Sequence, residues 1–260
     1  MAKGKNKRLP RKGKNSKRSD KHTFLKKQWF TLITPSALKK SIPVGWTCCK
    51  KPTGTEVTSD FLKGRVAEIC YADITGEAND VSKKIKIVVD EIHGRICATN
   101  FYSFELTRDR IYEKLKKRQS LVEVYSDVKT SDGIIYRLFT MLTTNRRSNQ
   151  VKLNSYAQHS KIKLARKTLV ADLLTYASTV TGDSLAHEAI TGVLDSRLEK
   201  LAHKVIPGVK LQVYKMKTVK RGVVDAKKLL KEAQDNAVNV QLAQESPEAA
   251  NLLTQEVGAQ

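Results

Sequence analysis

Apolar and polar residues alternate along much of the first 143 residues, and this period of two is typical of β-strands that bury one face. The alternation is clearest in Lys84–Glu91, where Ile85, Ile87 and Val89 are expected to face a core. Similar patterns predict strands over Lys27–Thr34, Val44–Lys51, Arg65–Ala72, Arg95–Tyr102, Leu121–Lys129 and Ile134–Thr143. Gly94 predicts a hairpin turn. The nearly continuous apolar run after Ser131-Asp132-Gly133 predicts a central strand.

Helical periodicity appears twice, and each time a capping residue marks the expected start. Thr107 is expected to cap a helix from Arg108 to about Arg118, with Ile111 and Leu115 facing the core. Ser155 and Gln158 fit a capping box that opens a longer helix, which ends near Ser178. The apolar stripe of this longer helix consists of Ile162, Ala165, Leu169, Leu173 and Ala177.

Two shorter helices and a final strand complete the predicted core. The helices are expected over Ser184–Leu194 and Ser196–Val205, with Asp195 capping the second and Pro207 ending it. Val209–Thr218 returns to strand alternation. The predicted class is therefore α+β, with an antiparallel β-barrel-like core and packed helices. Three regions follow: a basic arm over residues 1–23, the core over 24–221, and a helical to disordered acidic tail over 222–260.

The charge of the chain indicates that the protein binds a polyanion. The chain carries a net charge of +22, and its first 21 residues hold ten Lys or Arg and one acid. Such a segment cannot bury enough apolar surface to offset the entropy of ordering, so it is expected to be disordered until a polyanion neutralises it. Nucleic acid is the usual polyanion. The last 29 residues hold five acids and no Lys or Arg, so we expect little RNA contact there.

Candidate chemistry is sparse. The sequence has no phosphate-binding glycine loop, no GxSxG motif and no Cys-x₂₋₄-Cys or HExxH spacing, so we expect neither a cofactor nor a metal. Adjacent Cys48 and Cys49 would point to opposite faces of an extended chain, which favours reduced thiols. Ser155, His159 and Asp172 fall on one predicted helix and cannot surround a reacting centre. No apolar run is long enough to span a bilayer. Ala2 is small enough that removal of Met1 is expected.

The basic clusters remain as candidate RNA ligands. Gly64 would let the backbone approach a phosphate closely, and the small polar neighbours of Arg146-Arg147 suit phosphate and sugar contacts. Without an RRM, KH or zinc-knuckle signature, we expect recognition by shape and backbone rather than by sequence. The predicted RNA-binding residues are Lys5, Lys7, Arg8, Arg11, Lys12, Lys14, Lys17, Arg18, Lys63, Arg65, Arg108, Arg110, Arg146, Arg147, Lys163, Arg166 and Lys167.

Several short blocks, in one order, resemble a known family. They include Gly4-Lys5-Asn6-Lys7-Arg8-Leu9, Leu62-Lys63-Gly64-Arg65-Val66, Leu106-Thr107-Arg108-Asp109, Asp127-Val128-Lys129-Thr130, Arg137-Leu138-Phe139 and Ser155-Tyr156-Ala157-Gln158-His159. Over residues 1–231 the chain resembles the eS-one family of small-subunit ribosomal proteins, also called the S-three-A family. The acidic tail departs from the family pattern, so nothing is carried over there.

The resemblance implies a structural, non-catalytic component of the cytosolic small ribosomal subunit. Family members lie on the platform, near the messenger RNA exit and the 3′ end of the small-subunit rRNA. Small-subunit rRNA and neighbouring platform proteins are the implied partners, and messenger RNA and initiation factors are further candidates. Cytoplasmic ribosomes are the expected location, with nuclear and nucleolar passage during assembly. Two alternatives stay open: a free RNA chaperone or nucleic-acid-binding protein that only visits the ribosome, and an RNA-modifying enzyme with an unfamiliar site.

Overall fold

The computed structural model describes residues 24, 27–52 and 54–221. The basic arm, Ala2 and the acidic tail lie outside these residues, so the expectations placed on them stay predictions. The strands are β1 (Lys27–Ile33), β2 (Pro43–Lys50), β3 (Val66–Cys70), β4 (Lys83–His93), β5 (Ile96–Leu106), β6 (Leu121–Lys129), β7 (Ile135–Thr144) and β8 (Val209–Lys220). The helices are α1 (Thr58–Leu62), α2 (Ala72–Thr75), α3 (Arg108–Lys114), α4 (His159–Thr179), α5 (Gly182–Thr191) and α6 (Val193–Val205), with short 3-10 turns η2 (Ser36–Leu38) and η3 (Ala78–Ser82).

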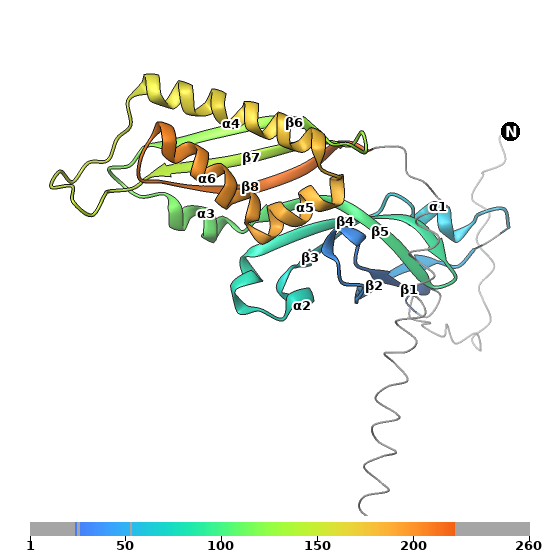
Figure 1. Ribbon diagram of the computed structural model, residues 1–260. Coiled ribbons are helices and arrows are strands. Elements are labelled where there is room, and N and C mark those ends of the chain that lie inside the picture. The colour runs from blue at the N-terminus through green and yellow to red at the C-terminus, as the bar shows by residue number, and fades with distance from the viewer. Residues whose placement is uncertain (1–23, 25–26, 53, 222–260) are drawn as a thin grey trace, which may run out of the picture.

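One eight-stranded sheet runs through the described part of the chain, and β5 joins its two halves (Figure 1). The order is β2-β1-β5-β8-β7-β6, and β4 pairs with β5 while β3 pairs with β4. Only the start of β5 meets β1, at Ile96 and Cys97, and only its end meets β8, at Ser103 to Glu105. The predicted α+β class is confirmed. The sheet is mixed rather than wholly antiparallel, because β1 and β5 run parallel.

The N-terminal half, made of β1 to β5, curls so that its two outer strands approach each other. Arg65, the residue before β3, donates from its guanidinium to the Thr47 hydroxyl at 2.6 Å and to the Cys48 carbonyl at 2.9 Å, both on β2. Among the described strands, no backbone ladder joins β2 to β3. A half-buried arginine therefore bridges the gap in this barrel-like half.

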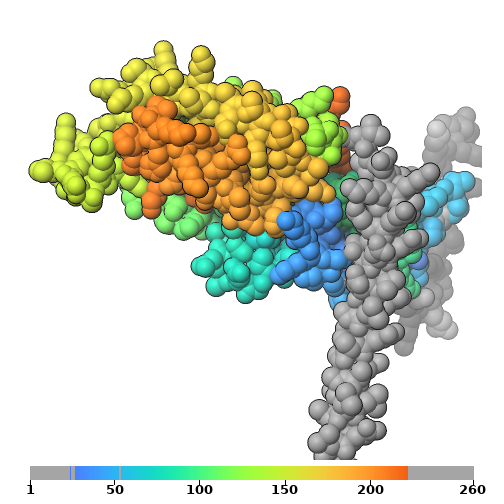
Figure 2. Space-filling view, viewed as in Figure 1, coloured from blue at the N-terminus to red at the C-terminus, as the bar shows by residue number. Residues whose placement is uncertain are grey.

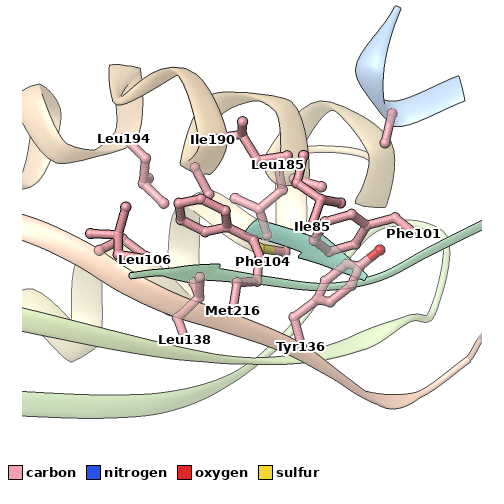
Figure 3. Close-up of a cluster of buried hydrophobic side chains, with 14 of the residues drawn as sticks. Ile85, Phe101, Phe104, Leu106, Tyr136, Leu138, Leu185, Ile190, Leu194 and Met216 are labelled. Carbon is pink, nitrogen blue, oxygen red and sulfur yellow. The ribbon is translucent and has the colours of Figure 1, made fainter. Parts of the chain in front are cut away.

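Helices α4, α5 and α6 cover one face of the sheet, as Figures 1 and 2 show. Beneath α5 and α6, Leu185, Ile190 and Leu194 meet the inner face of the strands (Figure 3). The strands contribute Ile85, Phe101, Phe104, Leu106, Tyr136, Leu138 and Met216 to this cluster. The predicted stripe of α4 packs here as well: four of its five residues are fully buried, and Ile162 is partly buried.

The strands predicted by alternation are confirmed, with ends shifted by a few residues. Ile85, Ile87 and Val89 are buried as expected. Val88 is buried too, although it lies on the opposite face of the strand from these three residues.

The capping bonds and the end of α3 were predicted wrongly, whereas α3 begins at Arg108 and α6 ends at Val205 as predicted. Thr107 precedes α3 without a side-chain capping bond, and α3 ends at Lys114 instead of near Arg118, so Leu115 is exposed. Ser155 lies in the loop before α4, where its hydroxyl bonds the Arg118 and Thr144 carbonyls, and no capping box forms. Helix α6 begins at Val193.

Candidate nucleic-acid interface

Three loops meet at one end of the C-terminal half of the sheet. They are residues 115–120 between α3 and β6, residues 145–158 between β7 and α4, and the turn at Gly208 between α6 and β8. The Ser155 amide donates to the Arg118 carbonyl at 2.9 Å, and the Ala157 amide donates to the Ser120 hydroxyl at 3.0 Å. The Asn145 amide donates to the Gly208 carbonyl at 2.7 Å. Hydrogen bonds therefore hold these distant segments together, and Figure 2 shows the 145–158 loop projecting beyond the helices.

The surface that these loops form is strongly cationic. Residues 115–120 and 145–158 contain no Asp or Glu. Their basic residues are all exposed, and within the described part of the chain none forms an ion pair with a carboxylate. We call this set the cationic end: Lys116, Lys117, Arg118, Arg146, Arg147 and Lys152. A cluster of unneutralised cations at one edge is the electrostatic footprint of a polyanion-binding surface.

Internal hydrogen bonds give the 145–158 loop a fixed shape. The Arg146 guanidinium donates two bonds to the Gln150 carbonyl, at 2.9 and 2.8 Å. The Gln150 side-chain amide in turn donates to the Lys152 and Asn154 carbonyls, each at 2.8 Å. These bonds hold the loop in shape without a partner, and its cations Arg147 and Lys152 are exposed.

Gly208 explains how the turn before β8 comes so close to this loop. Its φ of +79° is in the left-handed region, and a Cβ there would lie 3.1 Å from the Asn145 carbonyl oxygen. Any other residue would therefore strain the backbone and push the loop away.

The first turns of α4 continue the cationic surface. Lys161, Lys163, Arg166 and Lys167 are exposed, while Ala165 and Leu169 are buried beneath them. The Arg166 guanidinium also donates to the Glu123 carbonyl of β6 at 3.3 Å, which ties this part of the helix to the sheet edge. The helix begins at His159, directly after the 145–158 loop, so the helix cations lie close to the loop in the sequence.

Some predicted RNA ligands are not brought to this surface. Lys63 and Arg65 belong to the N-terminal half, where Arg65 already bonds β2. The Gly64 amide donates to the Val89 carbonyl at 2.7 Å, and φ is +78°, so this glycine serves a turn and its amide is occupied within the protein. Arg108 is exposed on α3, and Arg110 forms an ion pair with Glu113 on the same helix.

Sequence reasoning left out four members of the cationic end. Lys116, Lys117 and Arg118 form one of the basic clusters of the sequence, but they are not among the predicted RNA-binding residues. Lys152 was not singled out at all. The usable signal was the absence of acids from two separate loops, and only the fold shows that those loops meet.

The described part of the chain does not bring Ser155, His159 and Asp172 together. The described residues hold no group of three or more potential metal ligands among His, Cys, Asp and Glu. Ser155 is bonded to backbone carbonyls, and Asp172, paired with Arg197, lies about 20 Å along α4 from His159 at a rise of 1.5 Å per residue. Burial raises the pKa of the Cys97 thiol to about 11, which keeps it protonated. No described helix has the length and apolarity to cross a membrane.

Comparison with known proteins identifies a family. The sequence model of the Ribosomal S3Ae family matches residues 15–222. The chain is 34% identical to a protein of Babesia bovis and 35% identical to one of Plasmodium yoelii yoelii, each named small ribosomal subunit protein eS1. These alignments cover 99–100% of this chain and 99% of each relative. A relative of the same name in Theileria parva is 34% identical over 99% of both chains. The chain therefore belongs to the Ribosomal S3Ae family.

Proposed function

We propose that the chain is a structural, non-catalytic component of the small ribosomal subunit and that its cationic end binds rRNA. The carrying observation is that six exposed cations, free of carboxylate partners among the described residues, gather on acid-free loops that are held in shape by their own hydrogen bonds. The names of the relatives supply the ribosomal context.

The chemistry of this surface favours contacts with the RNA backbone. Lys and Arg neutralise phosphates and release condensed counterions, while Ser and Asn side chains donate to phosphate and sugar oxygens. The 145–158 loop offers both kinds of group, with Ser148, Asn149 and Asn154 between its cations. Such contacts position a protein on folded RNA without reading its sequence. The basic arm, with Lys5, Lys7, Arg8, Arg11, Lys12, Lys14, Lys17 and Arg18, would add further phosphate contacts.

Finer features of this proposal rest on the family resemblance. In this proposal the protein lies on the platform near the messenger RNA exit, beside other small-subunit proteins and within reach of initiation factors. Assembly in the nucleolus followed by residence in cytoplasmic ribosomes belongs to the same proposal. Lys163, Arg166 and Lys167 would extend the rRNA contact along α4 because they share an exposed face.

A paired-variant experiment tests the cationic end. Arg146→Gln combined with Arg147→Gln is compared with Lys129→Gln combined with Lys200→Gln, which removes two exposed cations from β6 and α6. We expect the first pair to weaken binding of a small-subunit rRNA fragment and to reduce the log–log salt slope by about 0.7–0.9 per lost phosphate contact. The control pair should leave the slope nearly unchanged. Equal slopes for both pairs would contradict the proposal.

Sedimentation separates an integral component from a visiting RNA chaperone. A tagged chain that remains with small subunits after a high-salt wash is a structural component. A chain that washes off completely, while still binding RNA, fits the chaperone alternative instead.

A further inference from the structure

The hairpin of β1 and β2 exposes both tryptophans of the chain. Trp29 on β1 is 49% exposed and Trp46 on β2 is 76% exposed. The ladder pairs Thr31 with Trp46 and Trp29 with Cys48, so both indoles and Thr31 lie on the same face. Exposing two large aromatic side chains to water is unfavourable, and exposed apolar patches of this kind mark binding sites.

Together with Arg95 these side chains line a hollow of about 490 Å³. Thr31 also lines the hollow, and its amide donates to the Arg95 carbonyl at 2.8 Å, which fixes the backbone of Arg95 beside the hairpin. Arg95 is exposed and, among the described residues, has no carboxylate partner. The hollow thus combines two flat apolar rings with one unneutralised cation.

The rim of the hollow adds aromatic surface and positive charge. The Phe24 ring stacks on Trp29 with 6.3 Å between ring centroids and an interplanar angle of 17°. The Lys27 ammonium lies 5.2 Å from the centre of the Phe24 ring. Glu56, a described carboxylate that follows β2, is paired with Lys50 at 3.3 Å. The rim therefore attracts an anion.

We propose that this hollow holds the base of an unpaired nucleotide, stacked on an indole, with Arg95 on its phosphate. The proposal rests on the proposed RNA-binding function and adds a second, chemically different surface to it. A base is flat and apolar on its faces and carries a phosphate at its edge, which matches the rings and the cation. Duplex RNA keeps its bases stacked internally and cannot offer them to the indoles. An apolar peptide segment would fill the hollow but leave Arg95 without an anion.

Intrinsic fluorescence reports on this site alone, because Trp29 and Trp46 are the only tryptophans in the chain. Titration of the full chain with a six-nucleotide oligouridylate should quench the emission to a saturable plateau. A short RNA duplex and heparin, which also bind cationic surfaces, should leave the emission unchanged. Oligouridylate binding without quenching, or equal quenching by heparin, would overturn the proposal.

Variants assign the effect to the hollow. Trp46→Leu and Arg95→Gln should each weaken oligouridylate binding, with a loss of about 5- to 150-fold for the lost stacking partner. Trp46→Tyr keeps a stacking face and should restore most of the affinity. The matched control is Tyr112→Leu on α3, which removes an exposed ring from another surface and should have no effect. Circular dichroism checks that each variant folds.

The outcomes also separate this site from the cationic end. If Arg146→Gln with Arg147→Gln lowers rRNA affinity while the quenching plateau remains, both surfaces act independently. If rRNA binds at the cationic end but no RNA quenches the emission, the nucleotide site is wrong and the proposed function stands. If Trp46→Leu leaves oligouridylate affinity unchanged but loses a neighbouring protein from reconstituted subunits, the hollow binds protein and the proposal is overturned.

Discussion

Asp195 is a residue whose carboxyl group the fold keeps from its usual ionisation. The sequence placed it as the cap of a helix, yet it lies in the first turn of α6, facing β8. Its Oδ1 accepts the Val213 amide at 2.8 Å. Burial raises the pKa of this carboxyl to about 7, a rise reinforced by Glu199, although the Val213 bond and Lys83 act in the opposite direction.

This pKa predicts a pH-dependent contribution to stability. Between about pH 4 and pH 7 the folded protein holds a proton that the unfolded chain releases, so the contribution of Asp195 to the free energy of unfolding falls as the pH rises through this window. Asp195→Asn keeps an acceptor for the Val213 amide and removes the titration. We expect the variant to be more stable than the wild type at pH 8, by at most about 4 kcal/mol, and similar to it at pH 4. Urea unfolding at both pH values measures the difference; a difference that does not change with pH would contradict the assignment.

The burial of Ile87 follows from the alternation of apolar and polar residues in β4. It was predicted to be a core residue, and its side chain is fully buried in β4. Ile87→Ala should lower the free energy of unfolding by about 2–5 kcal/mol because it leaves a cavity among packed neighbours. Val219→Ala, at an exposed position near the end of β8, is the control and should have little effect. A loss at Ile87 no larger than at Val219 would show that the β4 register is wrong.

At the scale of elements, strands were predicted well and helix caps poorly, for a physical reason. A strand with one buried face repeats its signal at every second residue, so a local break such as buried Val88 does not hide it. A cap depends on one side chain, and that side chain can find a different partner in the folded protein. Ser155 bonds the 115–120 loop and Asp195 bonds β8, and neither loop nor strand can be assigned as a partner from the local sequence.

Arg65 bridges β2 and β3 in the N-terminal half, and its removal should destabilise that half. Arg65→Ala leaves the Thr47 hydroxyl and the Cys48 carbonyl without their donor, so we expect a cost of about 1–3 kcal/mol in the free energy of unfolding. Amides of β2 should exchange with solvent faster. Lys63→Ala changes an exposed neighbour and should change neither. An RNA affinity that falls with Lys63→Ala but not with Arg65→Ala would assign the predicted RNA contact of this turn to Lys63.

At the scale of the whole molecule, the cationic end and the tryptophan hairpin lie at opposite ends (Figure 1). The net charge of +22 predicted a polyanion, but charge alone does not say where it binds. The run at Lys116–Arg118 and the pair Arg146-Arg147 meet only because the β6–β7 ladder brings Leu121 opposite Thr143. The sequence therefore predicts the class of partner, a polyanion, but not the location of the surface that binds it.

Two separated surfaces predict avidity for a single long RNA. An rRNA fragment that carries both a folded helix and an unpaired segment should bind at least tenfold more tightly than either part alone, because the second contact forms within the complex. Fluorescence anisotropy with the three RNAs measures this. Equal affinities for the whole and for its better half would mean that the two surfaces do not engage one RNA.

The position of β8 has a consequence for the newly made chain. It is the last strand in the described sequence, yet it lies between β5 and β7 in the centre of the sheet. At a synthesis rate of roughly 5–20 residues per second, the strand edges that will receive it wait on the order of 10 s after β5 leaves the ribosome. During that interval two apolar strand edges stay open to other chains, which is the condition under which nascent proteins aggregate. The nascent chain stays in this condition until residue 220 has emerged.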